Sequence, residues 1–336
     1  MNKHKITWAI ACVALALLMA FSAAYAGDPD RVGTAAGEQV LIPVGARDLA
    51  MNGANAAFSQ GLDAIYWNPA GFARFDNKAA GAFSTMEIFG DINVNYLALG
   101  FKMGKFGQIG FSMKSLDFGE IPITTNQDID GTSGATYSPS FLVGGLTYSK
   151  RLTDVIFVGA TAKLISERVP RASASAFAFD IGIQYHNIGN INGVSMGLVV
   201  KNIGTDMHYT GSAFLVPSGN DFVELPTASN QLPATVELGL GYKYNFNEQN
   251  SLVFNGNFEN NNYGSDAYKL GVEYGYTDLI FLRGGYKFMN DVSSEDVLNK
   301  WTLGAGIHYR WITFDYTFRH DEFFSGNNMF QLTLGF

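Results

Sequence analysis

Large apolar residues alternate with small or polar residues along most of the chain from about residue 78 onward. In the clearest segment the residues of one parity are all large and apolar: Phe177, Phe179, Ile181, Ile183 and Tyr185. Between them stand Ala178, Asp180, Gly182, Gln184 and His186. This period of two predicts β-strands with one apolar face. It recurs at 268–276, 280–288, 301–309, 312–318 and 330–336, whereas 78–88, 92–103 and 140–151 alternate poorly.

Three features of these segments favour a transmembrane barrel over a secreted β-sandwich. The segments are close to ten residues long, their apolar faces are rich in aromatic residues, and glycines stand among the charges on the opposite face. Counting the segments predicts about fourteen strands, an even number as in bacterial single-chain barrels. The predicted fold is therefore an all-β, antiparallel transmembrane barrel of about fourteen strands.

The connections between segments support this count. The two long polar stretches, 118–139 and 205–231, fall on the same predicted side of the membrane. The tight links at 104–105, 153–154, 277–278 and 310–311 all fall on the other side. Long outer loops and short periplasmic turns are typical of outer-membrane barrels. Aromatic residues also gather at the predicted strand ends, as in two interfacial girdles: Tyr242, Tyr244, Tyr274, Tyr276 and Tyr309 below, and Tyr286, Phe288, Trp301 and Phe318 above.

The N-terminus reads as a secretory signal peptide over residues 1–26. A basic start at 3–5 precedes an apolar run at 6–21, and Ala24-Tyr25-Ala26 offers a cleavage site before Gly27. An uncleaved anchor is the alternative, but the run is short and lacks a following basic stop. Cys12, the only cysteine, lies inside it, so the mature chain has no thiol for a disulfide or a metal site. Together with the strand pattern, this predicts a cell outer-membrane location.

Composition agrees with this picture. Charged residues make up 15% of the chain, aromatic residues 14%, and there are 38 glycines. The mean hydropathy is only +0.05, because an apolar stripe and a polar stripe average out. No run reaches the roughly 18 apolar residues of a membrane-spanning helix. The net charge of −8, without a Lys/Arg cluster, excludes a nucleic-acid partner.

Residues 27–77 do not alternate, and they precede the predicted barrel domain at 78–336. This stretch is rich in small residues, and Pro69 imposes a bend on it. It is either a periplasmic tail or a segment folded into the lumen. Because small residues pack closely inside a crowded barrel, the composition favours a hatch or plug. The N-terminus of the mature chain is accordingly expected in the periplasm or in the lumen.

A family resemblance is carried by the stretch Asp63-Ala64-Ile65-Tyr66-Trp67-Asn68-Pro69-Ala70-Gly71. It resembles the N-terminal hatch signature of the FadL-type outer-membrane transporters, with Asn68, Pro69 and Ala70 as the hatch motif. The pieces at 45–47, 53–54, 176–182, 197–204 and 232–235 are similar to the PorV/PorQ branch of that superfamily. The resemblance implies a fourteen-stranded barrel, a hatch in its lumen and a laterally open wall.

These observations lead to three hypotheses of function. The first is a PorV/PorQ-like transport or secretion-accessory protein, which in that branch serves type IX secretion. The second is FadL-like uptake of long-chain fatty acids or other hydrophobic compounds. The third is a structural or adhesive barrel. The partners expected are outer-membrane lipid, a hydrophobic small molecule and proteins of the secretion machinery.

The candidate chemistry does not require an enzyme, and no catalytic residue, metal or cofactor is predicted. The cluster His320-Asp321-Glu322 is read as a solvated loop, with a catalytic rim site as the alternative. Five charges on predicted inward faces are either a relay or paired lumen residues: Asp180, Glu237, Glu273, Arg283 and Arg319. Four apolar residues on the polar outer loops either pack on the barrel mouth or form a docking surface: Phe118, Ile121, Phe214 and Leu215.

Overall fold

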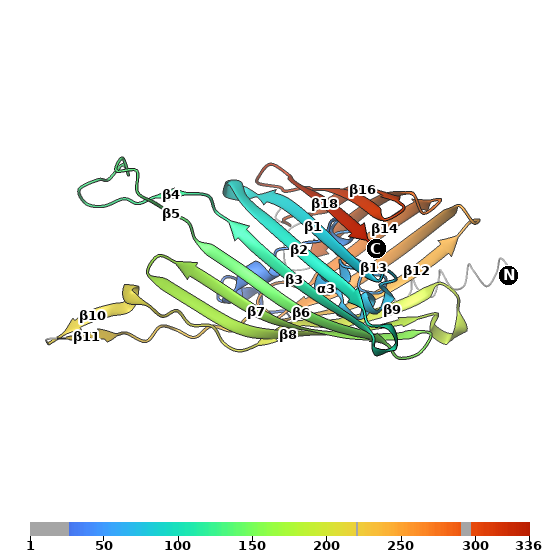
Figure 1. Ribbon diagram of the computed structural model, residues 1–336, viewed down its shortest axis with the longest axis horizontal. Coiled ribbons are helices and arrows are strands. Elements are labelled where there is room, and N and C mark those ends of the chain that lie inside the picture. Colours follow the sequence, from blue (N-terminus) through green and yellow to red (C-terminus); the bar gives the residue numbers. More distant parts are fainter. Residues whose placement is uncertain (1–26, 220, 290–296) are drawn as a thin grey trace.

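The computed structural model describes residues 27–219, 221–289 and 297–336, and the predicted signal peptide at 1–26 lies outside them. Within these residues fourteen antiparallel strands form a closed barrel (Figure 1), which confirms the predicted count. The strands are β1 (Ala79–Ile88), β2 (Ile92–Lys102), β3 (Gln108–Asp117), β6 (Ser140–Arg151), β7 (Ile156–Val169), β8 (Ala172–His186), β9 (Val194–Gly204), β12 (Thr235–Asn245), β13 (Asn250–Asn261), β14 (Ala267–Tyr276), β15 (Ile280–Met289), β16 (Trp301–Tyr309), β17 (Ile312–Arg319) and β18 (Asn327–Gly335). Strand β18 pairs with β1 and closes the barrel.

The two faces of the strands follow the alternation in the sequence. On β8 the side chain of Phe177 is 61% exposed on the outer wall, whereas Asp180 is fully buried in the lumen. Large apolar residues cover the outside of the other strands in the same way, as expected for a wall that contacts lipid. The period of two therefore separates a lipid-facing surface from a polar interior.

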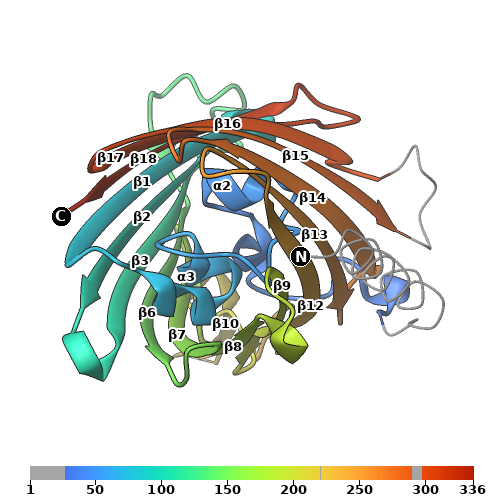
Figure 2. The same ribbon diagram turned by 90° about the vertical axis from the view of Figure 1, so that its right-hand side faces the viewer.

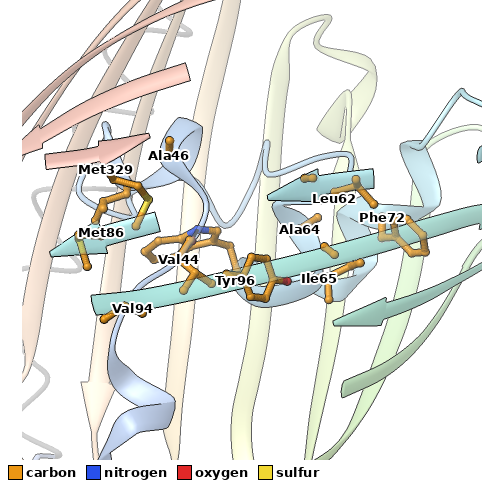
Figure 3. Close-up of a cluster of buried hydrophobic side chains, with 14 of the residues drawn as sticks. Val44, Ala46, Leu62, Ala64, Ile65, Phe72, Met86, Val94, Tyr96 and Met329 are labelled. Atoms are coloured by element: carbon orange, nitrogen blue, oxygen red, sulfur yellow. Dashed lines mark hydrogen bonds between the residues drawn. The ribbon is translucent and has the colours of Figure 1, made fainter. Parts of the chain in front are cut away.

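Strands β1 and β2 alternate poorly because their inner faces are apolar as well. Ala82, Met86, Val94 and Tyr96 point inward and are buried. They join one hydrophobic cluster with side chains of residues 44–75 (Figure 3). On this part of the wall the strands face protein on one side and the membrane on the other, so neither face is polar.

The long and short connections lie at opposite ends of the barrel. The connection after β3 carries the hairpin β4 (Ile121–Pro122) and β5 (Thr136–Tyr137), and the connection after β9 carries β10 (Leu215–Ser218) and β11 (Asp221–Glu224). Both hairpins project from the same end (Figure 1), called here the long-loop end. The opposite, tight-turn end holds the links that include η5 (Gly104–Phe106) and η6 (Ile188–Asn190).

The laterally open wall that the resemblance implied is not seen as a gap in strand pairing. Every pair of neighbouring strands in the described barrel is hydrogen-bonded. The register shifts once between β8 and β9, between Phe179 and Ile181. There the backbone amide of Asn202 donates to the carboxylate of Asp180 at 2.8 Å, so a side chain bridges the interruption.

Residues 27–77 are called the N-terminal segment, and Figure 2 shows parts of it, including α2 and α3, inside the ring of strands. Arg31 lies over the ring of Tyr263 near the long-loop end, while the amide of Lys78 bonds to the carbonyl of Phe336 at the tight-turn end. The first described residues thus lie at the long-loop end. The segment contains only short helices: η1 (Pro29–Arg31), η2 (Glu38–Leu41), α2 (Ala46–Leu49), α3 (Ala64–Trp67) and η3 (Pro69–Arg74).

Two further single-turn helices lie at the long-loop end, η4 (Phe89–Asp91) and η7 (Ser212–Phe214). Among the described residues, no helix has the length and apolar character needed to cross a membrane.

Candidate functional site

Inward-facing glycines on many strands allow the N-terminal segment to approach the wall closely. A methyl group on Gly159 of β7 would overlap the carbonyl oxygen of Pro69, and one on Gly197 of β9 would overlap that of Ala56. Eight other inward glycines lie close to backbone or side chains of the segment. Together these ten are called the glycine waist: Gly100, Gly110, Gly159, Gly182, Gly197, Gly239, Gly241, Gly271, Gly285 and Gly304. Many of the glycines in the sequence therefore provide room for a second layer of backbone inside the barrel.

The Asn68-Pro69-Ala70 motif joins the segment to the wall and to itself. The Asn68 amide group donates to the carbonyl of Ala56 at 2.8 Å, and its side-chain oxygen accepts from the amide of Ala70 at 3.1 Å. This second bond caps η3. The carbonyl of Pro69 accepts a hydrogen bond from Ser149 on β6 at 2.5 Å. The motif is fully buried and has a structural role in this arrangement.

Polar wall residues that the sequence analysis did not single out complete this attachment. Gln184 on β8 donates to the carbonyls of Ala56 and Ser59 at 3.0 and 2.9 Å. Gln331 on β18 accepts from the amide of Ala46 at 2.8 Å and donates to Asp63 at 2.7 Å. The one indication in the sequence was that both residues occupy positions of their strands predicted to face the lumen. The sequence could not show which backbone groups they would contact.

A chain of buried charges links the segment to three strands. Arg47 of α2 binds Glu273 of β14 through two hydrogen bonds of 3.0 and 2.9 Å. Glu273 also accepts from Arg283 of β15 at 2.6 Å, and Arg283 donates to Asp315 of β17 at 2.6 Å. Because the partners satisfy one another, these charges can remain ionised away from bulk water.

The five predicted lumen charges fall into separate groups rather than one network. Glu273 and Arg283 belong to the chain that begins at Arg47. Asp180 pairs with Lys163 at 2.6 Å, and Glu237 pairs with Lys201. Arg319 instead donates to the amide oxygen of Asn327 at 3.1 and 2.9 Å. A single relay through all five residues is therefore incorrect.

Replacing Arg47 tests how strongly this chain of charges holds the segment. We expect Arg47→Met to destabilise the protein by about 3 kcal/mol, since it removes one partner of a buried pair. Arg151→Met is the matched control, because its ion pair with Asp154 is exposed to solvent. Urea unfolding in lipid vesicles, followed by tryptophan fluorescence, measures both variants. Equal stability of the two would contradict a holding role for Arg47.

A cavity of about 220 Å³ lies between the N-terminal segment and the strands in the long-loop half of the barrel; it is called the outer cavity. The segment contributes apolar and aromatic residues to its lining: Val40, Leu41, Pro43, Leu49, Tyr66 and Trp67. The strands contribute mostly charged residues: Lys163, Lys201, Glu259, Lys269, Lys287 and Arg319. The lining therefore combines apolar and aromatic residues of the segment with cationic residues of the strands, and Lys201 lies over the rings of Tyr66 and Trp67.

A second cavity, of about 450 Å³, lies in the tight-turn half of the barrel and is called the inner cavity. Its lining includes both signs of charge: Arg47, Asp63, Arg74, Glu273, Arg283 and Asp315. Helix α2 lines both cavities, with Leu49 on the outer one and Arg47 on the inner one, and the segment lies between them. The Trp67 indole is fixed there by a 2.8 Å bond to the carbonyl of Val44 and packs on Gly53, where φ is 72° and a Cβ would overlap the ring.

The remaining candidate residues have local roles. His320 stacks on Trp301 with ring centroids 4.9 Å apart, and Asp321 accepts from the backbone amides of Phe323 and Phe324. This is a structured loop turn. Within the described residues, no three His, Cys, Asp or Glu side chains come together in a way that could hold a metal ion.

The predicted docking residues divide into packed and exposed side chains. Phe118 packs edge-on against Phe141 with centroids 5.0 Å apart, as the packing interpretation expects. Ile121 and Phe214 are half-buried. Leu215 stays exposed and has exposed neighbours on β11 that the sequence analysis did not name, Phe222 and Val223.

Comparison with solved structures identifies the fold. The toluene transporter TbuX of Ralstonia pickettii superposes with a TM-score of 0.56 and 13% identity, covering 88% of this chain and 98% of that chain. The monoaromatic hydrocarbon channel CymD gives 0.53 and 13% with the same coverage. The Pseudomonas putida toluene transporter TodX gives 0.51 and 14%, covering 84% and 95%. The chain has the fold of these hydrocarbon transporters.

This fold agrees with the fourteen-stranded barrel that the FadL-type resemblance implied. At such low identity the similarity extends to the fold alone. No family model and no curated protein matches the sequence.

Proposed function

We propose that the protein carries hydrophobic or amphiphilic small molecules across the outer membrane, with the N-terminal segment acting as a plug. The observation that carries this proposal is the placement of the segment between an outer and an inner cavity, with apolar and cationic residues lining the outer one. A general porin would instead need a continuous water-filled channel. The shared fold with toluene transporters supports the same function.

The orientation follows from the two ends of the barrel. Outer-membrane barrels place long loops outside the cell and short turns in the periplasm. The outer cavity would then receive molecules from outside, and the inner cavity would release them toward the periplasm. The plug would have to move, or to shift locally near Trp67, during each passage.

Uptake by intact cells tests this function, because a lipopolysaccharide leaflet slows hydrophobic solutes that cross ordinary bilayers freely. The host should lack its own hydrophobic-uptake barrels and express the full chain. We expect faster entry of radiolabelled toluene and oleate than in cells without the protein, and unchanged entry of arabinose. Equal acceleration of arabinose would indicate an open pore, and no acceleration of either hydrophobic solute would reject transport.

A second candidate function, secretion-accessory work of the PorV/PorQ type, is favoured by the loops. Leu215, Phe222 and Val223 are exposed on the β10–β11 hairpin. The two long loops, 118–139 and 205–231, carry six acidic residues and neither Lys nor Arg. One of them, Asp128, is held by the backbone amides of Ser133 and Thr132, which lower its pKa to about 2. An acidic surface with exposed apolar side chains suits a basic protein partner.

Purification in mild detergent followed by mass spectrometry separates the two candidates. Co-purified fatty acids or aromatic compounds would support uptake, whereas a secretion subunit in stoichiometric amount would support the accessory role. A protein with neither, and without uptake activity, would leave a structural or adhesive role.

A further inference from the structure

The lining of the outer cavity has more positive charge than its carboxylates neutralise. Lys163, Lys201 and Lys269 each have an acidic partner: Asp180, Glu237 and Glu259. Lys287 and Arg319 line the same cavity, and neither has a carboxylate within ion-pair distance among the described residues. An enclosed space with two such cations attracts an anion, because their mutual repulsion is relieved when one binds.

The part of the cavity that the segment lines suits a flat apolar group, beside the Lys201 ammonium that lies over its two aromatic rings. Tyr66 and Trp67 meet edge to face with ring centroids 5.1 Å apart, and Val40 and Leu49 lie beside them. The Tyr66 hydroxyl is turned away toward the carbonyls of Val40 and Leu41. Aromatic faces bind other rings through offset or edge contacts.

The volume sets the size of the ligand. An engineered apolar cavity of about 150 Å³ in another protein holds benzene. The outer cavity, at about 220 Å³, has room for one ring and a small polar substituent.

A buried hydroxyl in the cavity also lacks a partner. Thr235 at the start of β12 is 3% exposed and lines the cavity. Its hydroxyl is among the buried polar atoms for which the described chain provides no hydrogen bond. Buried hydroxyls are normally paired, so this atom is available to a bound ligand.

We infer that the outer cavity is a binding site for small monocyclic carboxylates of the size of benzoate, with the ring against Tyr66 and Trp67 and the carboxylate toward Lys287 and Arg319. This inference rests on the proposed function and adds to it a preference, among hydrophobic substrates, for amphiphiles with a compact anionic head. Neutral hydrocarbons of the same size would lack the charge that Lys287 and Arg319 attract.

Calorimetric titration of the processed chain in lipid nanodiscs tests the site. Benzoate is compared with toluene, which has the same ring without the charge, and with benzylammonium, which has the opposite charge. We expect benzoate to bind at least tenfold more tightly than either, and its affinity to fall as the salt concentration rises. Benzylammonium binding as tightly as benzoate would overturn the inference.

Variants assign the binding to the two cations. The double variant Lys287→Gln with Arg319→Gln should lower benzoate affinity at least tenfold and leave toluene binding unchanged. Lys105→Gln, at an exposed turn, is the matched control and should behave as the unmodified chain. Unchanged benzoate affinity in the double variant would reject the site. Uptake of toluene without any binding of benzoate would reject the carboxylate inference while leaving the transport function intact.

Discussion

Removing residues 27–72 is expected to convert the closed barrel into a permanently conducting pore. The deleted residues supply α2, α3 and most of η3, which separate the outer and inner cavities. The strands that remain have polar and charged inner faces over most of the wall, and water can hydrate them. Closure of the barrel itself depends on the pairing of β1 with β18, which the deletion does not touch.

Conductance across planar bilayers measures this effect. The full chain should show rare or no openings, and the deletion variant should show stable steps together with swelling of liposomes in arabinose. Heat-dependent mobility on electrophoresis establishes that the variant forms a barrel. A correctly folded deletion variant with no added leak would contradict the plug and favour a peripheral segment.

Filling the glycine waist is expected to expel or distort the plug without shortening the chain. In Gly159→Leu and Gly197→Leu the new side chain overlaps backbone carbonyls of Pro69 and Ala56, which cannot turn aside as a flexible side chain can. Overpacking of this kind typically costs about 1–3 kcal/mol at one site. Two such substitutions on different strands should together cost more free energy than the contacts of the segment with the wall contribute.

Gly144→Leu on β6 is the matched control, since a Cβ there meets open space. The measurements are conductance and trypsin cleavage after Arg47 and Arg74, which lie in the N-terminal segment. We expect the double waist variant to conduct and to be cleaved, and the control to do neither. Equal protection of Arg47 in both variants would mean that the segment is not held by close backbone contact with the wall.

Much of the barrel can be predicted from the sequence, because the alternation that marks each strand involves only residues that are neighbours along the chain. In a strand between lipid and a polar lumen, apolar and polar side chains must alternate from one residue to the next. The pattern in 177–186 is therefore visible without knowing which strands lie beside it. The same rule explains why the sequences of β1 and β2 alternate poorly. Their inner faces pack against residues 44–75, so the polar half of the signal is missing.

Residue types at the site could be predicted, but their groupings could not. The parity of Glu273 and Arg283 placed both inside, whereas their link to Arg47 joins positions 226 residues apart in the chain. Arg319 has the same parity as these charges, yet it lies in the outer cavity and, among the described residues, binds the amide oxygen of Asn327 rather than a carboxylate. Alternation specifies only which face of a strand a charge occupies. It does not specify the position of the charge along the barrel axis or the residue that it meets across the lumen.

The sequence by itself therefore determined a fourteen-stranded barrel, its two surfaces and the ends that carry long and short connections, because each depends on neighbouring residues along a strand. Only the tertiary structure decided that the N-terminal segment lies in the lumen against the glycine waist, dividing it into two cavities, and that Lys287 and Arg319 line one of them together with Tyr66 and Trp67. Those arrangements depend on the closure of the barrel around the segment, which brings together residues from opposite ends of the chain.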